Sequence, residues 1–111
     1  LDTTKNKLNI IKEVLDRTKN KKQISDVVAY TLILRIRTLY IINKLIKNEN
    51  YSKKDFIKLI KKISGANIYE RYLAVKNNYE EESKADIWEV KKLYEYLDEQ
   101  FKRTKKLVDE I

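Results

Sequence analysis

The sequence lacks cysteine, histidine, proline and methionine altogether, and its only glycine is Gly65. Without cysteine there are no disulfide bonds and no thiolate chemistry, and without histidine the commonest general base and metal ligand is missing. Tight turns and hairpins depend on glycine and proline, so a chain nearly free of both favours long helices joined by polar turns. These absences predict an all-α fold.

Long hydrophobic runs are also missing. The longest apolar stretch, from Val27 to Leu34, ends at Arg35 and is well short of the roughly 20 residues that cross a membrane. The N-terminus has amphipathic spacing rather than the apolar core of a signal peptide. We therefore expect a cytoplasmic protein with no membrane partner. Because the chain begins at Leu1 and not at methionine, we expect one domain, residues 1–111, cut from a longer chain.

Charge and hydrophobicity are both high. Hydrophobic residues make up 42% of the chain and charged residues 38%, which is enough apolar material for one packed core. The formal net charge is +8, from 25 Lys and Arg against 17 Asp and Glu. Such a balance favours an anionic partner, such as a nucleotide or nucleic acid. Part of the lysine excess is typical of an AT-rich coding sequence.

Apolar residues recur at spacings of three and four along five segments, which predicts five helices. Their approximate bounds are 2–18, 24–47, 52–64, 67–79 and 85–111, with a mobile basic connector at 19–23. We expect an antiparallel bundle of four to five helices, in which 24–47 and 85–111 form the long central and flanking pair. The residues of 85–111 that should face inward are Ile87, Val90, Tyr94, Leu97, Phe101, Thr104, Val108 and Ile111.

Helix boundaries are marked by short polar side chains and by the single glycine. Gly65 follows 52–64 at the point where a helix end favours positive φ. Serine, aspartate and asparagine accept hydrogen bonds from the free backbone N–H groups of a first helical turn. The candidate N-caps are Ser25 or Asp26, Ser52, Asn67 and Ser83.

The segment 24–47 is apolar on two sides, which predicts a helix with neighbours on both sides. A narrow polar line of Thr31, Arg35 and Thr38 separates the two apolar stripes. A partly buried arginine needs a partner, so we interpret Arg35 as ion-paired to a neighbouring helix; the alternative is a fixed guanidinium that binds phosphate at the edge of a cleft. The candidate carboxylate partners are Glu70, Glu89 and Asp98.

Arg37 requires a separate explanation, because two residues two apart differ by about 200° around a helix. It stands beside Tyr40 and Lys44, and we expect a more exposed position for it. Arg37 and Lys44 are candidates for a basic patch that binds phosphate, with Tyr40 as an aromatic contact.

The segment 67–79 interleaves aromatic and basic residues. Tyrosines that stack on bases beside cations that neutralise phosphate are a known combination in nucleotide and single-strand binding. Tyr69, Arg71 and Lys76 are therefore binding candidates. Tyr72 falls on the apolar face and is more simply a core residue with its hydroxyl at the rim.

Two further surfaces are candidates for contact with partners. Trp88 lies just off the inward stripe of 85–111, where it can cover the core or face a partner protein, a second copy of the chain included. The lysines of 52–64 form a face that is either simply solvated or a sequence-independent contact with nucleic acid. These lysines are Lys54, Lys58, Lys61 and Lys62.

Nothing in the sequence indicates catalysis. The serines have no histidine to activate them, and no glycine-rich loop is present to hold a phosphate. The only acidic cluster, Glu80–Glu82, is consecutive, so its carboxylates point in different directions and predict no metal site. We expect no catalytic residue, no metal and no cofactor.

One family resemblance accompanies these patterns. The stretches LILRIRTLYIINKLIKNENYSKKDFIKLI, 32–60, and IYERYLAVKNN, 68–78, resemble the helical C-terminal region of archaeal nucleotidyltransferase-domain proteins. Those proteins join a small catalytic domain to a helical bundle related to HEPN and substrate-binding domains. The resemblance implies an accessory domain that positions an acceptor or nucleotide for a catalytic domain in the same chain or in a separate subunit.

The chain departs from this family in two respects. The catalytic pattern, a Gly-Ser followed by an Asp-x-Asp pair, is absent. The HEPN ribonuclease signature places a histidine shortly after an arginine, whereas here Asn77 and Asn78 follow Arg71, and asparagine is not a general base. The resemblance thus implies a non-catalytic segment. The alternatives are a free-standing bundle that binds nucleic acid through phosphate contacts and a protein–protein interaction module.

Overall fold

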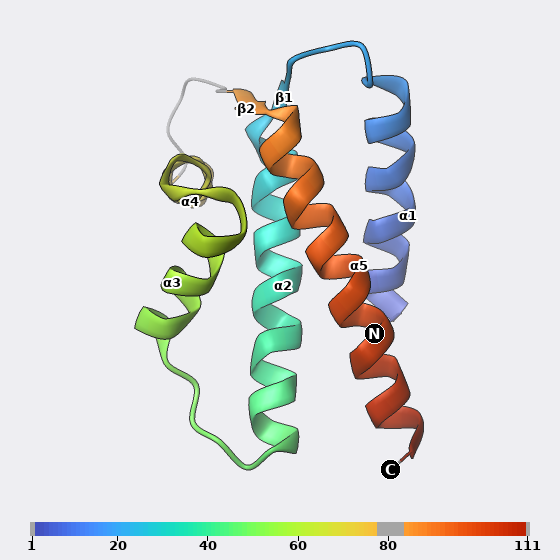
Figure 1. The fold of residues 1–111 in the computed structure, drawn as a ribbon, viewed down its shortest axis with the longest axis vertical. Helices are drawn as coiled ribbons and strands as arrows, with labels where there is room; N and C mark the ends of the chain where they lie inside the picture. Colours follow the sequence, from blue (N-terminus) through green and yellow to red (C-terminus); the bar gives the residue numbers. More distant parts are fainter. Residues whose placement is uncertain (1, 78–83, 111) are drawn as a thin grey trace.

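The computed structural model describes residues 2–77 and 84–110 (Figure 1). Helices dominate this part of the chain, and the predicted all-α class is confirmed. A single pair of three-residue strands is the only sheet within it. In chain order the elements are α1 (Asp2–Arg17), β1 (Gln23–Ser25), α2 (Asp26–Ile46), α3 (Lys53–Ser64), α4 (Ala66–Lys76), β2 (Lys84–Asp86) and α5 (Ile87–Glu110).

Three of the predicted helix boundaries have the expected chemistry. The Ser52 hydroxyl accepts a hydrogen bond of 3.2 Å from the backbone N–H of Asp55, and the Ser25 hydroxyl accepts one of 3.3 Å from Val27. Gly65 has a φ of 97° and ends α3. The N-cap prediction for Asn67 is wrong, because Gly65 also forms the N-cap of α4 and no side chain caps that helix. One residue of positive φ is enough to change the direction of the chain between the two helices.

The helix α2 is the centre of the domain, as its two apolar stripes predict. It packs against α5 on one side and α4 on the other (Figure 1). Leu32, Ile33, Ile36 and Leu39 are fully buried between these neighbours. Burying an aliphatic side chain stabilises a fold by about 1.5–3 kcal/mol, so this helix contributes a large part of the hydrophobic core.

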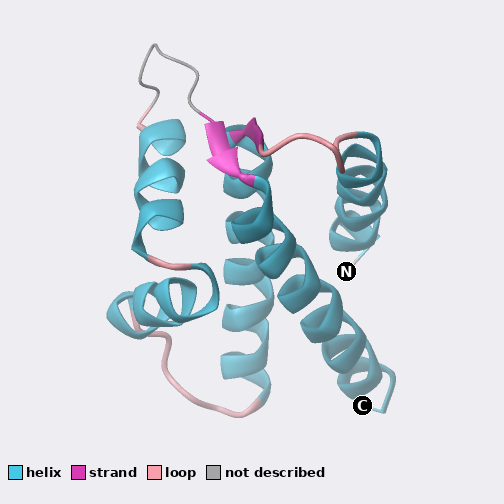
Figure 2. Cartoon of the chain, turned by 45° about the horizontal axis from the view of Figure 1, so that its top comes forward, coloured by secondary structure: helices cyan, strands magenta, loops and turns pink. Residues whose placement is uncertain are grey.

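A small ribbon joins the beginnings of the two long helices. The strand β1 pairs antiparallel with β2, with Gln23 opposite Asp86 and Ser25 opposite Lys84 (Figure 2). This corrects two expectations, because Gln23 is not part of a mobile connector and residues 85 and 86 are not helical. Each strand buries one apolar side chain, Ile24 or Ala85.

The ribbon also determines the direction of the long helices. Because α2 and α5 each begin directly after a strand of the pair, they start at the same end of the domain and run in the same direction (Figure 1). Their parallel arrangement differs from the antiparallel one expected for the long pair. Helix α1 does run antiparallel to both of them.

Most of the predicted inward face of α5 is buried. Val90, Leu97 and Thr104 are fully buried, whereas Val108 is 39% exposed and does not belong to the core. The end of α5 diverges from α2 in Figures 1 and 2, and residues 105–110 at this end are all exposed. At Thr104 the helices are joined by a polar contact, because Asn43 Nδ2 of α2 donates a 2.9 Å hydrogen bond to its Oγ1.

Ile111 and residues 78–83, on which several interpretations depended, lie outside the described part. These include Asn78, the acidic run Glu80–Glu82 and the N-cap candidate Ser83. Within residues 2–77 and 84–110, no helix combines the length and hydrophobicity needed to cross a membrane.

Candidate functional site

Three of the predicted binding residues meet in a small recess between α2, α3 and α4, which we call the α2–α4 hollow. Arg37 comes from α2, and Tyr69 and Lys76 come from α4. The hollow has a volume of about 100 Å³. The described residues that line it are Arg37, Tyr51, Lys53, Phe56, Tyr69, Tyr72 and Lys76.

Arg37 is held in the hollow by Tyr51, which lies in the loop between α2 and α3. The Arg37 Nε donates a hydrogen bond of 3.4 Å to the Tyr51 hydroxyl, and the guanidinium carbon lies 5.6 Å from the centre of the Tyr51 ring. This hydrogen bond raises the pKa of Arg37 above its ordinary value. The side chain is thereby oriented while its two terminal nitrogens form no hydrogen bond to another described residue. Such a guanidinium can bind phosphate in bidentate geometry.

The tyrosines of α4 form the wall of the hollow. Tyr69 is 8% exposed and Tyr72 is 5% exposed, and the Tyr72 ring stacks on Tyr30 of α2 with centroids 5.3 Å apart. Tyr72 is thus a core residue, as predicted, and Tyr69 is too deeply buried to stack on a base. Burial raises the pKa of both phenols. They therefore stay neutral at physiological pH and add no negative charge to the hollow.

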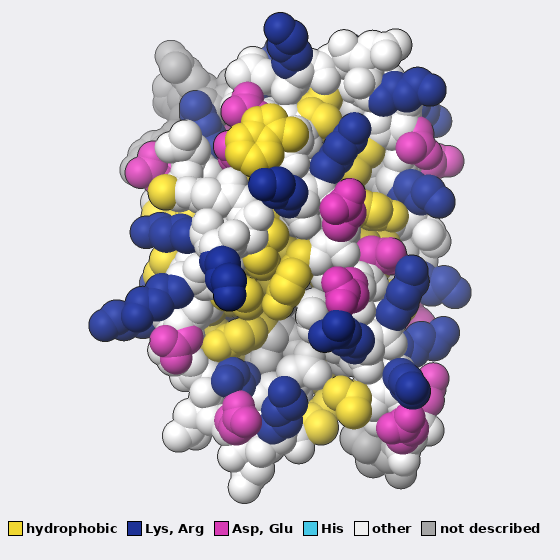
Figure 3. Space-filling model, in the orientation of Figure 1, with side chains coloured by type: hydrophobic (Ala, Val, Ile, Leu, Met, Phe, Trp, Pro, Cys, Tyr) yellow, Lys and Arg dark blue, Asp and Glu magenta, His cyan; other side chains and the backbone are white. Residues whose placement is uncertain are grey.

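The charge of the hollow has one sign. Arg37, Lys53 and Lys76 surround it, and no carboxylate belongs to its lining among the described residues. On the face of the molecule shown in Figure 3, Lys and Arg side chains border a strip of hydrophobic side chains and alternate with acidic ones. The hollow differs from that background because its three cations have no acidic counterpart within the recess.

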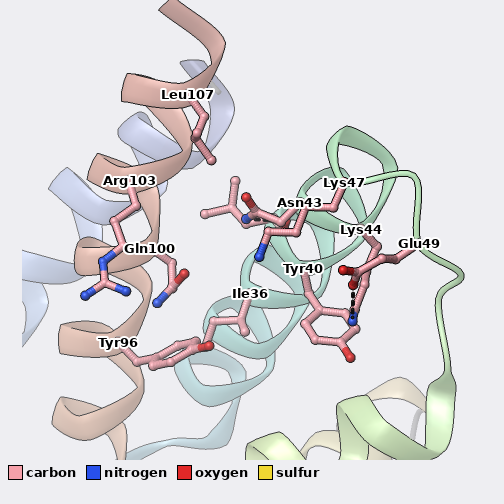
Figure 4. Close-up of a pocket in the computed structure, with 11 residues that line it drawn as sticks. Ile36, Tyr40, Asn43, Lys44, Lys47, Glu49, Tyr96, Gln100, Arg103 and Leu107 are labelled. Carbon is pink, nitrogen blue, oxygen red and sulfur yellow. Dashed lines mark hydrogen bonds and ion pairs between the residues drawn. The ribbon is translucent and has the colours of Figure 1, made fainter. Parts of the chain in front are cut away.

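The predicted residues Tyr40 and Lys44 lie in a different recess, between the C-terminal half of α2 and α5, which we call the α2–α5 groove. Its volume is about 280 Å³. Lys44 Nζ makes an ion pair of 2.9 Å with Glu49 and lies 5.5 Å from the Tyr40 ring (Figure 4). The groove is lined by Ile36, Leu39, Tyr40, Asn43, Lys44, Lys47, Glu49, Tyr96, Gln100, Arg103 and Leu107.

The ion pair changes the interpretation of Lys44. Its hydrogen bond to Glu49 raises the pKa of the ammonium and lowers that of the carboxyl group. Because Glu49 competes with phosphate for the Lys44 ammonium, and because Lys44 and Arg37 line different recesses, the two residues do not form one basic patch. Tyr40 separates the two recesses, since its ring packs against Tyr51 of the hollow at 6.0 Å and also lines the groove.

Arg71 lies apart from both recesses. It lines a pocket of about 370 Å³ next to the strands, which we call the strand-end pocket. The carboxylates Glu70, Asp86 and Glu89 line the same pocket. Acidic neighbours reduce the affinity of a cation for phosphate, so Arg71 is a weaker candidate than its sequence position suggests.

The interpretation of Arg35 as an ion-paired residue is wrong. It is partly buried, but within residues 2–77 and 84–110 no carboxylate lies within 4.0 Å of it. The threonines of the polar line need no partner from another helix, because Thr31 and Thr38 each donate a hydrogen bond to the backbone carbonyl four residues earlier. Partial exposure lets the guanidinium keep its contact with water, so no ion pair is required.

The remaining candidates lie on the surface. Trp88 is 54% exposed, and Lys92 Nζ lies 4.7 Å from the centre of its ring. The four lysines of the α3 face are exposed as well. In the described part of the chain, no group of three acidic residues is arranged to hold a metal ion.

Sequence reasoning missed several residues that line the two recesses. In the hollow these are Tyr51 and Lys53, and in the groove they are Lys47, Tyr96 and Gln100. Tyr51 had a recognisable signal, since it precedes the N-cap Ser52 and stands five residues before Phe56. These are the two positions of a hydrophobic staple. Both rings pack against Tyr40, with centroids 6.0 and 5.5 Å away.

Comparison with known proteins does not identify a relative. No family model matches the chain, and neither does any curated protein or solved structure. The resemblance to the accessory region of nucleotidyltransferase-domain proteins therefore stays a prediction.

Proposed function

We propose that this chain is a non-catalytic module that binds single-stranded nucleic acid, with a backbone phosphate in the α2–α4 hollow. The observation that supports this function is the set of three cations, Arg37, Lys53 and Lys76, around a neutral tyrosine wall with no carboxylate among the described lining residues. Arg37 is oriented by Tyr51 and is available for a bidentate contact.

The size of the hollow favours a polymer over a free nucleotide. Sites that enclose small ligands have volumes of about 300–1,000 Å³. At about 100 Å³ the hollow holds a phosphate-sized group, and the rest of the ligand must lie on the surface around it. A nucleic acid strand meets this condition, and the exposed lysine face of α3 gives its neighbouring phosphates a place to bind.

The role as an accessory domain of a nucleotidyltransferase-like protein is compatible with this proposal. In that setting the bound strand is the acceptor, and a catalytic domain in the same chain or in a separate subunit supplies the chemistry. A full coding sequence without an upstream Gly-Ser and Asp-x-Asp segment would contradict the same-chain form of this role.

The test measures binding of a labelled single-stranded oligonucleotide by fluorescence anisotropy at two salt concentrations. We expect the double variant Arg37→Ala/Lys76→Ala to bind about tenfold more weakly. Its plot of log affinity against log salt should become shallower by about 1.4, because each phosphate contact on a single strand contributes about 0.7 to the slope.

A matched control removes the same charge elsewhere. Lys105 and Lys106 are exposed residues near the end of α5 and line neither recess. The variant Lys105→Ala/Lys106→Ala should lose much less affinity. Equal losses in the two variants, or no binding of the native chain at low salt, would reject the hollow as the binding site.

A further inference from the structure

The α2–α5 groove has a chemistry that phosphate binding does not require. Its floor is apolar, since Ile36 and Leu39 are buried. Tyr40 of α2 and Tyr96 of α5 form its two opposite sides (Figure 4). Aromatic walls over an apolar floor suit a planar ring better than a phosphate. The ring gains binding energy from stacking and from apolar burial, whereas a phosphate gains little from an apolar surface.

Two side-chain amides supply hydrogen bonds within this groove. The amide nitrogen of Asn43 donates to the Leu39 carbonyl at 3.0 Å and to Thr104 Oγ1 at 2.9 Å, so both of its N–H groups are used. Its carbonyl oxygen remains as an acceptor in a fixed position. Gln100 makes no side-chain hydrogen bond to another described residue and offers both a donor and an acceptor. Hydrogen-bonding edges of this kind are what protein amides recognise on nucleobases.

Among the described residues that line the groove, one cation, Lys47, forms no ion pair. Lys44 is ion-paired with Glu49, and Arg103 makes an ion pair of 2.6 Å with Glu99. Lys47 has no carboxylate within 4.0 Å among the described residues, and its side chain extends toward the space between α2 and α5, opposite Gln100 (Figure 4). A single ammonium beside a ring-sized space is suited to one nucleotide.

Volume and position connect the groove with the hollow. At about 280 Å³ it lies near the lower limit for sites that enclose small molecules, which is enough for one base. The Tyr40 ring that lines the groove lies 6.0 Å from the Tyr51 ring that lines the hollow, so the two recesses adjoin. A strand with a phosphate at Arg37 can place a neighbouring base in the groove.

We propose that the α2–α5 groove is a nucleobase site, which holds one base against the rings of Tyr40 and Tyr96 and reads its edge with Asn43 and Gln100. This inference rests on the proposed function, because the strand that places the base is held at the hollow. It goes further in two respects. It assigns a second site, and it makes the binding affinity depend on the presence of bases, which phosphate contacts alone do not do.

The first experiment compares a labelled oligonucleotide with an abasic strand of the same length, which has the same phosphates and sugars. The native chain should bind the base-bearing strand about tenfold more tightly, because only this strand can place a base against the tyrosine rings. Tyr96→Leu, which removes one of the two aromatic rings, should remove most of this preference, and Gln100→Ala, which removes only a contact to the base edge, should reduce it in part. The control Asn9→Ala removes an exposed amide from α1 and should keep the preference. Equal affinity of the native chain for the two strands would overturn the base site.

The second experiment separates this inference from the proposed function. Adenosine 5′-monophosphate is titrated into the isotopically labelled chain, with ribose 5-phosphate as the ligand that lacks a base. Adenosine 5′-monophosphate should shift the side-chain amide signals of Asn43 and Gln100, whereas ribose 5-phosphate should leave them unchanged. If no oligonucleotide binds but these signals shift, the base site is supported and the proposed nucleic-acid function is rejected. If neither strand binds and the amide signals do not move, both proposals fail.

Discussion

The α2–α4 hollow and the strand-end pocket lie along the same helix but have opposite electrostatic character. Helix α4 supplies Tyr69, Tyr72 and Lys76 to the hollow, and it supplies Glu70 and Arg71 to the strand-end pocket. In the hollow the cations meet only neutral side chains among the described residues, whereas the strand-end pocket places Arg71 and Lys84 together with three acidic residues, Glu70, Asp86 and Glu89. The affinity of a cation for an anionic ligand thus depends on the residues that other elements bring beside it.

The largest effect should follow removal of the floor of the hollow. Phe56 is buried, lines the hollow and packs against Tyr40 at 5.5 Å. Phe56→Ala should lower the free energy of unfolding by about 3–5 kcal/mol, because it removes buried surface and leaves a cavity. Urea denaturation measures this loss. A loss below about 1 kcal/mol would mean that Phe56 does not hold the hollow in its shape. The electrostatic difference between the hollow and the strand-end pocket would then not be fixed by the fold.

The second prediction compares the two arginines directly. Arg37→Ala should weaken oligonucleotide binding about fivefold, and Arg71→Ala should weaken it less than about twofold, because carboxylates beside Arg71 already offset its charge. Anisotropy at a fixed low salt concentration measures both. Similar losses would show that net charge, and not its local arrangement, controls binding.

The third prediction concerns the acidic side of the comparison. Glu89 is 7% exposed, and burial, with a smaller contribution from Asp86, raises the pKa of its carboxyl group. The native state therefore binds this proton more tightly than the unfolded state. The contribution of Glu89 to stability is greatest at low pH and is lost as the pH rises through the raised pKa.

Glu89→Gln should consequently stabilise the chain at pH 7 by about 1 kcal/mol, because the buried charge is removed. The difference from the native chain should shrink below the ordinary glutamate pKa of about 4.3. Denaturation series at several pH values give both quantities. A variant that is less stable than the native chain at pH 7 would indicate that the carboxylate has a favourable partner.

The smallest effect should come from the Tyr51 hydroxyl. Tyr51→Phe keeps the ring beside Arg37 and Tyr40 but removes the 3.4 Å hydrogen bond from Arg37. Since this bond is long and exposed, the free energy of unfolding should change by less than about 0.5 kcal/mol. Arg37 loses an orienting contact, so oligonucleotide affinity should fall more than stability does. Unchanged affinity would show that the ring alone positions Arg37.

Much of the fold could be predicted because it depends on local patterns. The apolar stripes of α2 placed it in the centre, Ser52 and Gly65 marked the bounds of α3, and the three–four spacing of α5 gave most of its buried face. Each of these signals lies within a few turns of one helix, where sequence distance and spatial distance agree.

The ribbon and the sites could not be predicted in the same way. Strands of three residues, each with one buried apolar side chain, are too short for an alternating pattern. The hollow combines Arg37, Tyr51 and Lys76, which come from three different elements. Arg37 and Lys76 were identified by residue type, but only the fold brings them together and separates Arg37 from Lys44.

The ribbon has a consequence for how the chain folds. Helical bundles with short connections form mostly local contacts and fold quickly. Here Ser25 pairs with Lys84, and the large interface between α2 and α5 joins segments on either side of α3 and α4. That interface cannot form until the intervening chain has closed into a loop, which costs conformational entropy before any of its contacts stabilise the fold. The parallel long helices thus give this small helical domain a slower, more cooperative folding step than a simple up-and-down bundle requires.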